Sequence, residues 1–92
     1  MTYDSVCRQT VTVNLENGLH LVPCSQIAQF ARSFDCDVQI SNNDVTVDAK
    51  NVFDLMTLNA IHGSMLVLEA AGNGAAEVIK GLVSLFESNF ES

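Results

Sequence analysis

Apolar residues along this 92-residue chain follow two different spacings in turn, and this switching constrains its fold more than any other feature. Polar and apolar residues alternate strictly over residues 10–15, which predicts a strand with one buried face. After a turn at residues 16–18, apolar residues recur every three to four positions, which predicts an amphipathic helix over residues 21–34. The apolar stripe of that helix consists of Ile27, Phe30, Ala31 and Phe34.

The middle of the chain repeats the alternating pattern twice. Residues 36–40 and 45–48 both alternate, and the polar pair Asn42-Asn43 between them predicts the turn of a hairpin. A short helix is expected over residues 51–58, because Asn51 can accept a hydrogen bond from the first turn as an N-cap residue. Its inward-facing residues are predicted to be Val52, Leu55 and Met56.

The last third of the chain adds a fourth strand and a third helix. Residues 64–70 alternate again, and Asn73 can cap a helix whose apolar stripe extends from Ala75 to Phe86. The order is therefore β-α-β-β-α-β-α, and the helical stripes can be buried only against the apolar face of the strands. We predict an α+β fold, an open-faced β-sandwich with a four-stranded, mostly antiparallel sheet and all helices on one face. The opposite, solvated face of the sheet is expected to carry Thr10, Thr12, Asp37, Gln39, Thr46 and Asp48.

Length and charge limit the class of protein further. The chain is short enough for a single domain over residues 1–92, in which residues 1–8 form an N-terminal extension before the first strand. Eleven acidic residues against four basic ones give a net charge of −7, which argues against nucleic acid and anionic membranes as partners. No apolar run approaches the roughly 20 residues of a membrane span, and the N-terminus lacks a signal-peptide pattern. Three cysteines without a CxxC pair favour a reducing cytoplasm.

The segment with chemical meaning is residues 18–24. Pro23 is tolerated only in the first turn of a helix, so the helix must begin just before it, and His20 lies at or next to the N-cap. The backbone amides of Leu21 and Val22 are then free to bind an anion. A neutral imidazole beside such an anion cradle is a suitable acceptor for a phosphoryl group.

Other roles for these residues remain open at this point. A histidine near a helix start is commonly a surface cap or a turn residue without chemistry. Cys24 follows His20 by four residues and could form a thiol nucleophile with a histidine base, or half of a metal site. Cys7, Cys36 and His62 offer no metal-ligand spacing, so no metal is expected. A small apolar Cys24 behind the first turn is favoured.

Two motifs resemble the HPr family, the histidine-containing phosphocarrier proteins of the bacterial phosphoenolpyruvate:sugar phosphotransferase system. The family pattern N-x-x-G-L-H-x-R-P-A is matched in Gly18, Leu19, His20 and Pro23. The family segment K-S-I-x-x-[LVM]-[ML]-x-L is similar to residues 50–58. The resemblance covers about residues 9–88, and the open-faced sandwich of the family agrees with the element order above.

The resemblance implies a function. Enzyme I would phosphorylate His20 on Nδ1 at the expense of phosphoenolpyruvate, and enzyme IIA domains or other acceptors would take the phosphoryl group for sugar transport. The chain would be a cytoplasmic, monomeric, stoichiometric carrier, without a cofactor and without turnover of its own. The phosphate cradle and its surrounding surface would consist of Gly18, Leu21, Val22 and Cys24, and the partner-docking helix would present Asn51, Val52, Phe53 and Met56.

Three departures from the family pattern concern the same surface. The Arg two residues after the active histidine, which screens the phosphoryl charge, is Val22 here. The small Ala after the Pro is Cys24, and the regulatory Ser of many Gram-positive relatives is Asn51. Loss of a charge-assisted hydrogen bond costs about 1.5–3 kcal/mol, enough to slow transfer about tenfold or more. The alternative function is therefore a regulatory interaction module of the same fold, with weak or no phosphoryl transfer.

Overall fold

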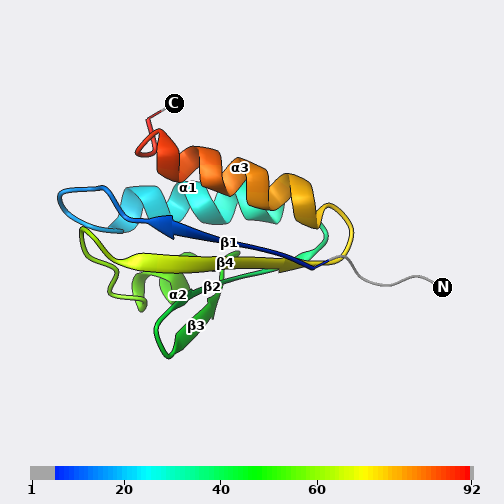
Figure 1. Ribbon diagram of the computed structural model, residues 1–92, viewed down its shortest axis with the longest axis horizontal. Helices are drawn as coiled ribbons and strands as arrows, with labels where there is room; N and C mark the ends of the chain where they lie inside the picture. Colours follow the sequence, from blue (N-terminus) through cyan, green and yellow to red (C-terminus); the bar gives the residue numbers. More distant parts are fainter. Residues whose placement is uncertain (1–5, 92) are drawn as a thin grey trace.

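Four strands form a single antiparallel sheet in the order β1-β4-β2-β3, and three helices pack on it (Figure 1). The computed structural model describes residues 6–91. The strands are β1 (Val6–Thr12), β2 (Asp37–Asn42), β3 (Val45–Asp48) and β4 (Met65–Ala71), and the helices are α1 (Leu21–Arg32), α2 (Val52–Met56) and α3 (Ala75–Glu87). The predicted order of elements and the predicted sheet type are both confirmed.

The sheet has one apolar face because the alternating residues of its strands stay in register. β4 lies between β1 and β2, and its residues Leu66, Leu68 and Ala70 are buried together with Val38 and Ile40 of β2. A fully buried Leu, Ile or Val side chain contributes about 1.5–3 kcal/mol to folding. The six polar residues predicted for the solvated face are all exposed, as expected.

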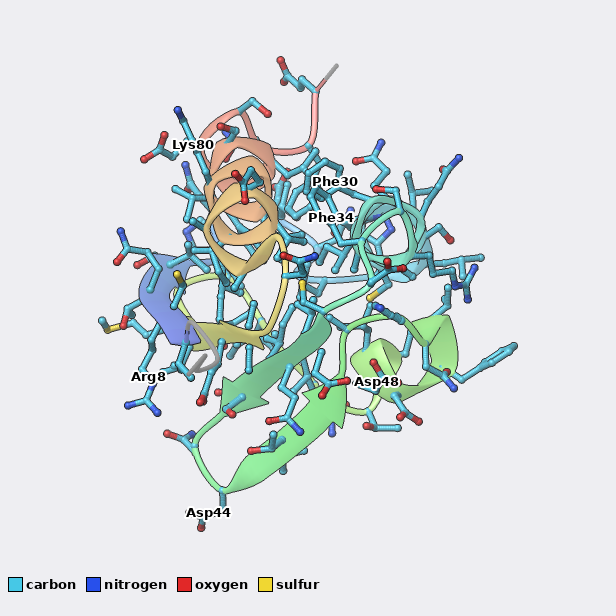
Figure 2. All side chains as sticks on the ribbon, turned by 90° about the vertical axis from the view of Figure 1, so that its right-hand side faces the viewer. Arg8, Phe30, Phe34, Asp44, Asp48 and Lys80 are labelled. Carbon is cyan, nitrogen blue, oxygen red and sulfur yellow. The ribbon has the colours of Figure 1, made fainter. Side chains whose placement is uncertain are left out.

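All three helices lie on the apolar side of the sheet, which leaves its polar side open (Figure 2). α1 and α3 pack against each other, and α2 packs against α1 and β3. The two longer helices bury Ile27 of α1 and Val78 and Leu82 of α3 against the strands. No helix within residues 6–91 has the length and apolar character needed to cross a membrane.

The first strand begins earlier than predicted. Residues 6–8 pair with β4, so they belong to the sheet, and the predicted N-terminal extension over residues 1–8 is wrong for them. The alternation of apolar residues starts only at residue 10. Residues 6–8 nevertheless join the strand, because β4 extends to Ala71 and its last residues pair with them. Residues 1–5 of the predicted extension lie outside the described residues.

α1 is shorter than predicted. It ends at Arg32 instead of Phe34, and the Ser33 hydroxyl donates to the Phe30 carbonyl oxygen at that end (2.7 Å). The Phe34 carbonyl oxygen accepts a hydrogen bond from the Lys50 ammonium group (2.7 Å). A residue distant in the sequence therefore contacts this helix end, which helical spacing alone does not reveal.

Two turns use other residues than predicted. Gly74, and not Asn73, is the N-cap residue of α3, with a φ of 85° that glycine adopts readily. The hairpin between β2 and β3 turns at Asn43 and Asp44, whereas Asn42 belongs to β2. Asn43 has a φ of 57°, a left-handed conformation that Asn tolerates better than most residues.

α2 is a short helix of about one and a half turns, and its start is predicted correctly. The Asn51 side chain accepts a hydrogen bond from the Asp54 amide (3.1 Å), which confirms Asn51 as the N-cap residue. Leu55 is buried and Val52 is half-buried, as predicted. Met56 is exposed, so its predicted inward orientation is wrong: the helix ends at this residue, and its last position turns away from the core.

Candidate functional site at the start of α1

Backbone hydrogen bonds hold His20 at the start of α1. Glu16 and Asn17 form the turn before it, and the Gly18 amide closes this turn by donating to the Leu15 carbonyl oxygen (2.9 Å). The His20 amide donates in turn to the Gly18 carbonyl oxygen (3.0 Å). The loop therefore has a defined shape up to the histidine.

The segment between α2 and β4 supports this loop from the side. The Leu19 amide donates to the Ala60 carbonyl oxygen (2.9 Å). Gly18 has a φ of 69°, and a Cβ atom at this position would overlap the same carbonyl oxygen. Only glycine fits both conditions. Because its amide already donates to the Leu15 carbonyl oxygen, Gly18 positions the loop and has no donor left for the predicted phosphate cradle.

His20 is the N-cap residue of α1, as the position of Pro23 predicts, with φ −90° and ψ −167°. Its carbonyl oxygen accepts the first hydrogen bond of the helix from the Cys24 amide (3.1 Å). The imidazole is exposed and does not cap the helix. The amides of Leu21 and Val22 donate to no group within residues 6–91. An exposed imidazole and two unused donors thus meet at the positive end of a helix dipole.

Cys24 lies in the core beneath the first turn of α1. Its side chain is 0% exposed, and its Sγ lies 3.6 Å from the Leu19 carbonyl oxygen, to which the thiol donates. Burial raises the pKa of the Cys24 thiol from 9.0 to about 11. Nucleophilic attack and metal binding need the thiolate, so both of these roles are disfavoured for Cys24. Its predicted place in the surface around His20 is wrong, because Cys24 fills the core. Within the described part of the chain, no group of three or more His, Cys, Asp or Glu side chains is arranged to hold a metal ion.

Large exposed apolar side chains cluster on the elements next to His20. α2 packs against α1, and the segment after α2 lies at the end where α1 begins, because the backbone of residues 60–61 touches the Gly18 position (Figure 1). Contiguous exposed apolar groups of this kind mark interaction surfaces. We name this set the apolar rim: Leu21 (54% exposed), Val22 (59%), Phe53 (79%), Met56 (42%) and Ile61 (70%).

The apolar rim contains part of the predicted docking helix and one residue, Ile61, that was not predicted from the sequence. Phe53 and Met56 are exposed as a docking role requires, whereas Val52 is half-buried and the Asn51 side chain is occupied as a helix cap. Ile61 was missed because it lies in no periodic segment. Its one signal in the sequence is a large apolar residue inside an otherwise polar turn.

Comparison with known proteins agrees with the fold. A family model described as "PTS HPr component phosphorylation site" matches residues 7–88. Phosphocarrier protein HPr of Vibrio cholerae serotype O1 is 35% identical over 77 residues, which cover 84% of this chain and 91% of that protein. Phosphocarrier protein NPr of Escherichia coli K12 is 28% identical over 85 residues, which cover 91% of this chain and 94% of that protein.

A solved structure extends the likeness to the whole architecture. The crystal structure of HPr-C-His from Thermoanaerobacter tengcongensis superposes with a TM-score of 0.88 at 31% identity, and the match covers 94% of this chain and 98% of that one. The family match and these likenesses span most of the chain. The chain therefore belongs to the HPr family, the phosphocarrier proteins of the phosphotransferase system.

Proposed function

We propose that His20 is the phosphoryl acceptor of this phosphocarrier and that the transferred group lies against the amides of Leu21 and Val22. The observation that carries this proposal is an exposed imidazole beside two amides that no group within residues 6–91 uses. The other histidine, His62, lies in the turn before β4, where no helix start provides such donors.

The transfer exchanges one bond to phosphorus for another. A ring nitrogen of neutral His20, Nδ1 by resemblance to the family, attacks phosphorus with its lone pair. The bond between phosphorus and the donor atom breaks at the same time, and the donor atom keeps that electron pair. The second ring nitrogen keeps its proton, so no other group has to take it. The reverse exchange on a second partner returns His20 to its starting state.

The first turn of α1 can stabilise the bound group without a side-chain cation. A phosphoryl group carries a charge of about −1.5 to −2 at neutral pH, and the start of a helix is equivalent to about +0.5. Each charge-assisted hydrogen bond from an amide adds about 1.5–3 kcal/mol. Two such bonds, from Leu21 and Val22, replace part of the stabilisation that the family Arg provides.

We further propose enzyme I as the donor, and enzyme IIA domains or other phosphoryl acceptors as the recipients. These are the partners that membership of the HPr family implies, and the apolar rim offers them a contact surface beside His20. In this role the chain is a monomeric cytoplasmic carrier. It is not an enzyme with turnover of its own, since each cycle of phosphorylation needs both partners.

The alternative function, a regulatory module without phosphoryl transfer, has less support. It depends on Val22 standing where the family has a charge-screening Arg. The exposed ring of His20 and the two unused amides favour transfer, and the relatives with the matching sequence are themselves phosphocarriers.

Labelling with radioactive phosphoenolpyruvate and enzyme I tests the acceptor. We expect an acid-labile, alkali-stable label that His20→Ala abolishes and that His62→Ala retains, because the second variant removes the only other imidazole. A label that persists in His20→Ala contradicts the assignment of the acceptor. No label at a high concentration of enzyme I supports the regulatory module instead.

A further inference from the structure

Two of the four basic side chains of this chain are held at the far end of α1. The Lys50 ammonium group donates to the Phe34 carbonyl oxygen (2.7 Å), and Arg32 Nε donates to the Lys50 carbonyl oxygen (2.8 Å). The helix has 12 residues, which separates its two ends by about 18 Å. That distance exceeds the reach of either side chain, so neither can screen a charge on His20.

The other two basic side chains lie along the first half of β1. Arg8 pairs with Glu69 on the open face of the sheet (3.3 Å). Lys80 lines a hollow of about 460 Å³ between α3 and β1, together with residues 7–9. Figure 2 shows Arg8 and Lys80 on the same side of the molecule as β1. A strand rises about 3.3 Å per residue, so Arg8 lies about 13 Å from Thr12, after which the chain leaves β1 toward His20.

The surroundings of His20 are therefore apolar and acidic. Glu16 lies in the turn before it, Asp54 lies on α2, and the apolar rim carries no charged group. The net charge of −7 becomes about −8 once a phosphoryl group is bound, because the ring that keeps its proton offsets one of the two negative charges of that group. The fixed partial charges of two amides offset only a fraction of the negative charge on the phosphoryl oxygens. Full neutralisation of that charge needs a cation from outside the chain.

We propose that the partner protein supplies this cation: its docking face is apolar and carries an Arg or Lys that contacts the phosphoryl oxygens on His20 during transfer. The inference rests on the proposed role of His20. An apolar face fits the rim by burial, and a basic group fits the unscreened phosphoryl charge. Contact over Val22, which is 59% exposed, excludes water and so strengthens the attraction between that cation and the phosphoryl oxygens. The cation exchanges no bond or proton, and the atom balance of the transfer is unchanged.

Two substitutions that add the same charge at different places test the proposal. Val22→Arg places a cation inside the apolar rim. Gln39→Arg is the matched control, since Gln39 is exposed on the open sheet face between Asp48 and Glu69, far from any proposed contact. One portion of each of the three proteins is treated with phosphoramidate, a small donor that needs no partner, to test the acceptor alone. On a second, unphosphorylated portion, kcat/KM is measured with phosphoenolpyruvate and the enzyme I of the same cell.

We expect Val22→Arg to lower kcat/KM about tenfold or more, because like charges meet in the contact, and Gln39→Arg to stay within about twofold. We also expect kcat/KM of the unsubstituted chain to fall with added salt, which screens the attraction. The inference is overturned if kcat/KM rises in Val22→Arg, or if it falls equally in Gln39→Arg. It is also overturned if added salt does not change kcat/KM of the unsubstituted chain. Enzyme I that is inactive toward all three proteins overturns it as well. Failure of phosphoramidate to label His20 contradicts the proposed acceptor itself, which is a separate result.

Discussion

Gly18 is the residue on which the placement of His20 depends most directly. Gly18→Ala puts a side chain at a φ of 69° and forces a Cβ atom against the Ala60 carbonyl oxygen. We expect the free energy of unfolding to fall by about 2–4 kcal/mol, and labelling of His20 to slow, because the loop must move away from residue 60. Urea denaturation and the labelling assay measure the two effects.

Gly63→Ala is the control for that substitution. Gly63 also has a positive φ, of 92°, but a Cβ atom there meets no other atom within 4 Å. The free energy of unfolding of this variant should fall by only about 1 kcal/mol, because Ala adopts a positive φ less readily than Gly. His20 should be labelled at the normal rate. Equal losses of stability in the two variants would show that the close approach to Ala60 has no separate effect.

At Cys24, burial makes stability depend on pH in the alkaline range. The folded protein holds the thiol proton more tightly than the unfolded chain, since the pKa rises from 9.0 to about 11 on folding. This contribution is complete below the lower value, and the free energy of unfolding falls as the pH rises through the interval, by about 2–3 kcal/mol in total. Urea denaturation near both ends of the interval measures it. The Cys24→Ala variant should be less stable at every pH, but its free energy of unfolding should not show this fall in the alkaline range. Parallel pH profiles for the two proteins would contradict the assignment of the fall to the Cys24 thiol.

At the scale of elements, α1 and α3 meet where Gly81 leaves room for the Phe30 ring. A Cβ atom at Gly81 would overlap that ring. Gly81→Ala gains about 1 kcal/mol of helix propensity but overpacks the contact by about 1–3 kcal/mol. In a Phe30→Leu background the ring is gone, so the same substitution should be more favourable by about 1 kcal/mol or more. Urea denaturation of the four proteins measures this coupling, and an identical effect in both backgrounds would disprove it.

The type and order of the elements could be predicted because each strand and each helix buries one face. Burial of one face requires apolar residues at a spacing of two in a strand and of three to four in a helix, and that spacing is visible within the element itself. The ends depend on partners elsewhere in the chain. Residues 6–8 join β1 because β4 extends alongside them, and the turn before α3 uses the left-handed conformation of Gly74. Neither cause leaves a periodic pattern in the sequence.

The candidate site was predictable to the same extent. Pro23 fixes where α1 can begin, so the position of His20 at the N-cap follows from local rules alone. The burial of Cys24 and the exposure of Ile61 depend on how α1 packs on the core and on the segment after α2. Such packing brings together residues that are distant in the sequence, and the spacing of residues along the chain does not predict these contacts.

The whole molecule carries a net charge of −7, with 11 acidic residues spread along the chain. Repulsion among them opposes the compact state, and added salt screens it. We expect the melting temperature to rise by about 2–5 °C between low and high NaCl concentration, as calorimetry can measure. Gln39→Arg, which changes the net charge from −7 to −6, should reduce the rise. A melting temperature that falls with salt would instead indicate that ion pairs such as Arg8–Glu69 dominate.

The four basic side chains lie at the far end of α1 and along the first half of β1, whereas His20 lies where α1 begins. The end of the molecule where His20 lies therefore has acidic residues, Glu16 and Asp54, and no basic side chain of the described residues beside them. A positively charged partner surface meets no repulsion from a side chain at this end, so an encounter that begins beside the imidazole is not turned away before the two proteins touch.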